Sequence, residues 1–163
     1  GNINMQSRSL IDDGNNIFDY WSEISYNDGI TTYFLNGDKF QRLYNYLASI
    51  SISYYDSINF KIHIHEVEVQ HHYILRNYNL NNAIDQGVYI FTLNDNIENI
   101  PSIFTDANHF CFLLVILDIP SQKTAQMIFQ GHSKGISSEV YIRHQSIDDW
   151  QNHVTPPAWV IVP

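Results

Sequence analysis

The chain has 163 residues, a formal net charge of −9 and a single cysteine, so it fits one or two small domains and contains no intrachain disulfide. The acidic balance repels phosphate backbones and argues against a nucleic-acid partner. The longest uncharged apolar run covers residues 110–117, far fewer than the roughly 20 residues of a membrane-spanning helix, so membrane insertion is not expected.

Short apolar segments dominate the chain. They are rich in Ile, Val, Thr, Tyr and Phe and run with a period of two residues or without interruption, a pattern typical of β-strands. Gly, Asn, Asp, Ser and Pro separate the segments and predict turns. The predicted strands are residues 29–36, 49–54, 60–69, 72–77, 87–93, 110–118, 125–130, 138–144 and 158–162. The predicted fold is mainly β, a compact antiparallel β-rich knob with one or two short helices.

The clearest helix prediction covers residues 38–49, where apolar side chains recur at helical spacing and Asp38 can cap the start. The clearest strand prediction covers residues 110–118, which are apolar at both parities. Such a segment is an aggregation template on a sheet edge, so we expect a central strand covered on both faces. Cys111 lies within it, and a buried thiol there is inert.

A weak internal repeat suggests two related modules. Residues 29–36 align with residues 87–94 and share Gly, Leu and Asn at equivalent positions. The predicted organisation is an N-terminal connecting segment at residues 1–13, a diverged β module at residues 14–80 and a second β module at residues 81–163. Because no low-complexity linker separates the modules, we expect them to pack closely.

Residues 63–72 contain an unusual concentration of histidine. On a strand, His63 and His65 share one face and can reach one metal ion. A cupin-like metal-dependent β-barrel enzyme is therefore the alternative reading, although Glu66 and Glu68 come too early for the cupin pattern. A third reading places His63 and His65 of three chains around one axial iron, as in phage fibres. The favoured expectation is a solvent-facing row, with no metal and no cofactor.

Segments of the C-terminal half follow a recognisable order. They are residues 84–89, 112–116, 125–129 and 140–143, followed by Trp150 and Trp159. In order and spacing, residues 80–163 resemble the pyocin-knob-like modules at the tips of phage tail fibres and R-type bacteriocin fibres. The two Trp residues are further apart than is usual in that family, which predicts an inserted loop. Residues 14–80 look like a more diverged copy of the same knob-like module.

The resemblance implies a non-enzymatic receptor-binding tip of a phage, or phage-like particle, tail fibre. Such tips are usually homotrimers, located on the virion, that attach to a bacterial surface polysaccharide or outer-surface protein. The Asn, Tyr and Trp side chains of the sequence suit hydrogen bonding and stacking with neutral sugars. The candidate ligand contacts lie in two predicted loops and are Tyr54, Tyr55, Asp56, Asp148, Asp149, Trp150, Asn152 and His153.

Overall fold

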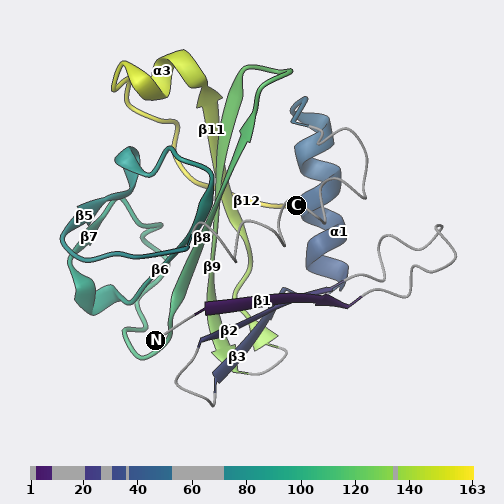
Figure 1. The fold of residues 1–163 in the computed structure, drawn as a ribbon, viewed down its shortest axis with the longest axis vertical. Helices are drawn as coiled ribbons and strands as arrows, with labels where there is room; N and C mark the ends of the chain where they lie inside the picture. The colour runs from purple at the N-terminus through teal and green to yellow at the C-terminus, as the bar shows by residue number, and fades with distance from the viewer. Residues whose placement is uncertain (1–2, 9–20, 27–30, 36, 53–71, 134–135) are drawn as a thin grey trace, which may run out of the picture.

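A central β-sheet organises the fold (Figure 1). The computed structural model describes residues 3–8, 21–26, 31–35, 37–52, 72–133 and 136–163. The strands of the central sheet lie in the order β12-β11-β9-β8-β6-β4, and β10 pairs with β9. Neighbouring strands are antiparallel except β4 and β6, which are parallel. These strands are β4 (His72–Ile74), β6 (Gly87–Phe91), β8 (Cys111–Asp118), β9 (Lys123–Ser133), β10 (Ile136–Ser137), β11 (Tyr141–Ser146) and β12 (Val160–Ile161).

The remaining elements surround this sheet. Three strands form a separate antiparallel sheet, namely β1 (Ile3–Arg8), β2 (Trp21–Tyr26) and β3 (Thr31–Leu35). Two short strands, β5 (Tyr78–Asn79) and β7 (Ile97–Glu98), pair in parallel. The helices are α1 (Gly37–Ser49) and α3 (Ile147–Gln151), with single 3-10 turns at Leu80–Asn82 and Leu93–Asp95. The prediction of a mainly β fold with one or two short helices is confirmed.

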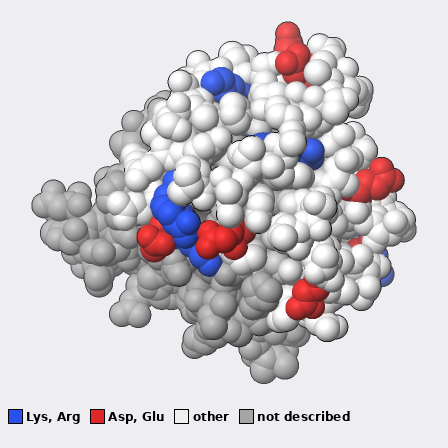
Figure 2. Space-filling view, turned by 180° about the vertical axis from the view of Figure 1, so that it is seen from behind, with Lys and Arg blue, Asp and Glu red and all other residues white. Residues whose placement is uncertain are grey.

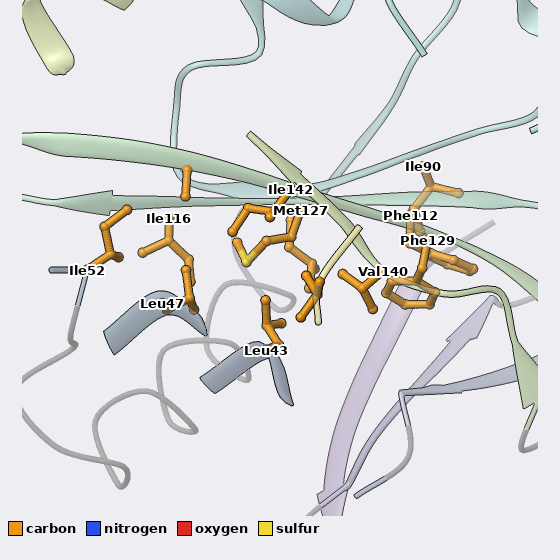
Figure 3. Packing of buried hydrophobic residues seen from close by; sticks show 13 residues of the cluster. Leu43, Leu47, Ile52, Ile90, Phe112, Ile116, Met127, Phe129, Val140 and Ile142 are labelled. Atoms are coloured by element: carbon orange, nitrogen blue, oxygen red, sulfur yellow. The ribbon is translucent and has the colours of Figure 1, made fainter. Parts of the chain in front are cut away.

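Strand β8 is covered on both faces, as its continuous apolarity predicts. Its even-numbered residues Phe112, Leu114 and Ile116 belong to the core under α1. Figure 3 shows Leu43 and Leu47 of α1 directed at this face of the sheet. The rings of Phe112 and Phe129 stack there with centroids 5.4 Å apart.

The odd-numbered residues of β8 belong to a second core on the opposite face. Cys111, Leu113 and Val115 pack there with Tyr89 and Phe91 of β6, and the segment that contains β5 and β7 covers them. Burial raises the pKa of the Cys111 thiol to about 12. The thiol is therefore protonated at neutral pH and is not a nucleophile.

The end of α1 corrects the predicted strand at residues 49–54. The helix continues to Ser49 and closes with paired hydrogen bonds, from Ile52 N to Leu47 O (2.8 Å) and from Ser51 N to Ala48 O (3.1 Å). Ser51 has the left-handed backbone (φ 64°) that this termination requires. The side chain of Ile52 folds back into the core under α1, so its apolarity reflects helix capping and not a strand.

Most other predicted strands are present with shifted ends. The predicted strand at residues 72–77 ends at Ile74, and Asn77 takes a left-handed backbone (φ 52°) just before β5 begins. The strand predicted at residues 138–144 begins later, at Tyr141, and continues to Ser146. Asp38 lies in the first turn of α1, not before it, and pairs with Arg42 at 3.2 Å. The predicted strand at residues 60–69 lies outside the described residues.

Described elements that precede Leu80 in the sequence pack against elements that follow it. Leu43 and Leu47 pack against side chains of β8 and β9, and β4 pairs with β6. The predicted modules 14–80 and 81–163 are thus in close contact through α1 and β4. Their descent from one duplicated module stays a prediction.

Candidate functional site

The residues singled out from the sequence fall into two groups. Tyr54, Tyr55 and Asp56, together with the histidines His63 and His65, lie outside the described residues. Their roles as ligand contacts or metal ligands stay predictions. Within the part of the chain that the structure describes, no group of His, Cys, Asp and Glu side chains has an arrangement suited to a metal ion.

The second group surrounds α3, where a loop was predicted. Asp148 and Asp149 are exposed and lie in the first turn of this short helix, which the Ser146 side chain caps by accepting a hydrogen bond from Asp149 N (3.1 Å). Trp150 is only 2% exposed, and its indole Nε1 donates to the carbonyl of Thr124 at 3.0 Å. Trp150 is therefore a core residue of this fold, which buries its ring and pairs its one polar atom, and its assignment as a ligand contact stays a prediction.

Asn152 and His153 follow α3 and are exposed. His153 has a left-handed backbone (φ 58°), which turns the chain away from the helix axis. Both side chains are accessible to a ligand, but the pocket described below does not include them. Their role in binding stays a prediction.

Arg143 is the most unusual side chain near this end of the molecule. It lies on β11 and is only 5% exposed. The guanidinium carbon is 4.4 Å from the ring centroid of Trp159 and 5.6 Å from that of Trp150. Aromatic faces attract a cation at such distances, most strongly when water is excluded. The two Trp residues thus hold one buried positive charge.

Hydrogen bonds from Arg143 fix its orientation. Its Nε donates to Gln126 Oε1 at 2.8 Å, and its Nη2 donates to Asn81 Oδ1 at 2.9 Å. Gln126 lies opposite Arg143 on β9 and donates in turn to the carbonyls of Leu80 and Ala83. These hydrogen bonds hold the turn at Leu80–Asn82 against the sheet, and they fix the side of the guanidinium that carries Nε and Nη2.

The charge of Arg143 has no ion-pair partner among the described carboxylates. Arg42 pairs with Asp38 and Glu139, and Arg76 pairs with Asp95, but Arg143 has only amide and aromatic partners. Burial lowers the pKa of Arg143 to about 10. It remains protonated at neutral pH, so this part of an acidic protein carries an uncompensated positive charge.

An open pocket of about 380 Å³ adjoins Arg143. The segment at residues 99–103 forms one part of its wall, residues 157–159 form another, and β11 contributes Tyr141 and Arg143. The indole Nε1 of Trp159 donates to the carbonyl of Asn99 at 2.9 Å and joins the two segments. The lining residues are Asn99, Ile100, Pro101, Ser102, Ile103, Tyr141, Arg143, Pro157, Ala158 and Trp159.

The chemistry of this lining suits a sugar. Trp159 and Tyr141 offer aromatic surface for the apolar face of a sugar ring, and Asn99 and Ser102 offer an amide and a hydroxyl. A neighbouring hollow of about 270 Å³ differs, since its lining includes the carboxylates of Asp106 and Glu139. The pocket beside Trp159 is therefore the better candidate for a sugar or an anion.

Sequence reasoning missed this pocket, although it singled out Trp159 and Arg143 as part of a motif. The signal was available in one respect: a charged residue stands in the strand pattern of residues 140–143, where burial is expected. Nothing in the sequence indicated that residues 99–103 would lie beside Trp159. That contact joins segments about 60 residues apart.

No family model matches the chain, and no curated protein matches it. No helix among the described residues has the length and apolarity needed to cross a bilayer.

Proposed function

We propose that this chain is a non-enzymatic receptor-binding module, the tip of a tail fibre on a phage or phage-like particle, and that it attaches to a bacterial surface glycan. The observation that carries the proposal is the pocket beside Trp159. It combines aromatic rings with amide and hydroxyl groups, the combination that sugar recognition uses.

The resemblance to pyocin-knob-like modules supports the fibre assignment. Its four matched segments include residues of β6, β8, β9 and β11, which are neighbours in the central sheet. Its two Trp residues flank Arg143, which ends the fourth segment. A motif whose parts pack on one another is better support than one whose parts are scattered.

The surface is also suited to a polar partner such as a glycan. Figure 2 shows acidic and basic side chains on one face as small separate groups with uncharged surface between them. Only 15% of the chain is charged, below the typical value of about 25%. A partner would therefore contact this surface mainly through hydrogen bonds and aromatic rings.

Binding to bacterial surface polysaccharide tests the proposal directly. We expect the protein to bind in a panel of capsular, lipopolysaccharide and teichoic-acid preparations, and Trp159→Leu to weaken that binding at least about tenfold by removing the aromatic platform. Asn152→Ala is the matched variant at the predicted loop contact. A loss with Trp159→Leu alone assigns binding to the pocket, and a loss with Asn152→Ala alone assigns it to the loop. Absence of binding across the panel contradicts the proposal.

The proposal includes threefold assembly, because a fibre tip repeats the symmetry of its fibre. Light scattering at micromolar concentration is expected to give a mass three times the 19.0 kDa of one chain. A stable species of one chain's mass counts against the fibre assignment and leaves the sugar pocket as a separate question.

A further inference from the structure

We propose that the pocket beside Trp159 takes an acidic sugar, with its carboxylate or phosphate group bound by the guanidinium of Arg143. This inference rests on the proposed function and narrows its ligand class. Three observations carry it: the unpaired charge of Arg143, the unused donors of its guanidinium, and the lining of the pocket that it faces.

The charge of Arg143 has no counter-ion among the described residues. A buried cation is costly unless an opposite charge or strong dipoles compensate it. The described partners of Arg143 are two amide oxygens and two indole rings, and none of them is an anion. An anionic group in the pocket supplies the missing counter-charge. Burial has already removed much of the water that weakens such a pair at the surface.

The guanidinium of Arg143 has N–H groups that no described residue accepts from. Of its five N–H groups, Nε uses one for Gln126 and Nη2 uses one for Asn81. Nη1 hydrogen-bonds to no described residue, and it is not among the fully buried polar atoms that lack a partner. It therefore keeps accessible surface, and Arg143 lines the pocket. The Gln126 and Asn81 bonds hold one edge of the guanidinium and leave Nη1 for an incoming oxygen.

The residues that line the pocket also favour an anionic ligand. The described residues that line the pocket include Arg143 but no Asp or Glu, so they do not repel an anion. Trp159 stacks on Arg143 at 4.4 Å and also borders the pocket. A sugar ring resting on the aromatic surface thus places an acidic substituent within reach of the guanidinium. Charge-assisted bonds of this kind are about twice as strong as neutral ones.

The test compares three probes on the same protein: trigalacturonic acid, its neutral methyl ester and a glycerol phosphate oligomer. Isothermal titration calorimetry is expected to show at least about tenfold tighter binding of an acidic probe than of the ester. The first and third probes separate a carboxylate from a phosphate ligand. Equal affinity for acid and ester, or failure of both acidic probes to bind, overturns the inference.

Variants at Ser102 test the effect of a negative charge in the pocket without altering the core. Ser102 is exposed and lines the pocket. Ser102→Glu is expected to bind the acidic probe at least about tenfold more weakly than Ser102→Gln, which has the same size and lacks the same hydroxyl. Asn94→Glu, at an exposed position outside the pocket, adds the same net charge and is expected to have little effect. Equal effects of Ser102→Glu and Ser102→Gln contradict a role for charge.

Failure of this inference is distinguishable from failure of the proposed function. If surface polysaccharide binds and Trp159→Leu abolishes that binding, but no acidic preference appears, the receptor-binding function stands and the acidic ligand is wrong. If no polysaccharide and no probe binds, both are wrong.

Discussion

Lysine at either Leu114 or Val115 is expected to abolish the soluble, folded protein. The two residues are neighbours on β8 and face opposite cores, Leu114 under α1 and Val115 under the segment that contains β5 and β7. Each substitution buries an ammonium group within an apolar core, at a cost of several kcal/mol. That is a large share of a total stability of about 5–15 kcal/mol.

Ile119→Lys is the matched control, because Ile119 is 56% exposed just beyond the end of β8. We expect it to express and melt like the parent protein. Soluble yield and a thermal unfolding curve by circular dichroism make the comparison. A cooperative, parent-like transition in either core variant means that β8 is not covered on that face.

The buried polar network is expected to show strong coupling between Arg143 and Gln126. Arg143→Met leaves Gln126 Oε1 and Asn81 Oδ1 without their donor. Gln126→Met leaves Nε of the buried guanidinium without its acceptor and the Ala83 carbonyl without its Gln126 donor, and it removes one of the two donors to the Leu80 carbonyl. Each substitution alone is expected to lower the free energy of unfolding by about 3 kcal/mol. The double variant should lose about 1–3 kcal/mol less than the sum, since it removes both ends of one bond.

Urea unfolding of the four proteins in this cycle gives the coupling. Arg76→Met is the control for loss of an arginine. The Arg76 side chain is 78% exposed, and its Nε forms a long ion pair of 3.8 Å with Asp95 Oδ1. It should change stability by less than about 1 kcal/mol. Additive losses at positions 143 and 126 would falsify the idea that these side chains act as one unit.

The local pattern of apolar residues predicted those helices and strands that depend mainly on their own sequence. Strand β8 needed only its apolar run, and α1 needed only the helical spacing of residues such as Leu43 and Leu47. The exit from α1 was not predicted, because Ser51 takes a left-handed backbone without being glycine. The parallel pairing of β4 with β6 was also missed, since it depends on how distant segments meet and not on their composition.

The candidate site was less predictable than the fold. Trp150 and Trp159 look alike in the sequence, yet one is buried and the other borders a pocket. The difference arises from tertiary placement: Trp150 packs from α3 onto β9, whereas Trp159 meets the segment that begins at Asn99. Neither contact leaves a local trace in the chain.

The ends of the central sheet bear on how the protein behaves at high local concentration. Among the described residues its outermost strands are β12, with two residues, and β4, with three. Short outer strands present few free backbone groups to another sheet. Strand β8, whose continuous apolarity would favour aggregation at an edge, has two further strands beyond it on one side and three on the other. Copies packed side by side can therefore come close without their sheets joining, unless the sheet first opens.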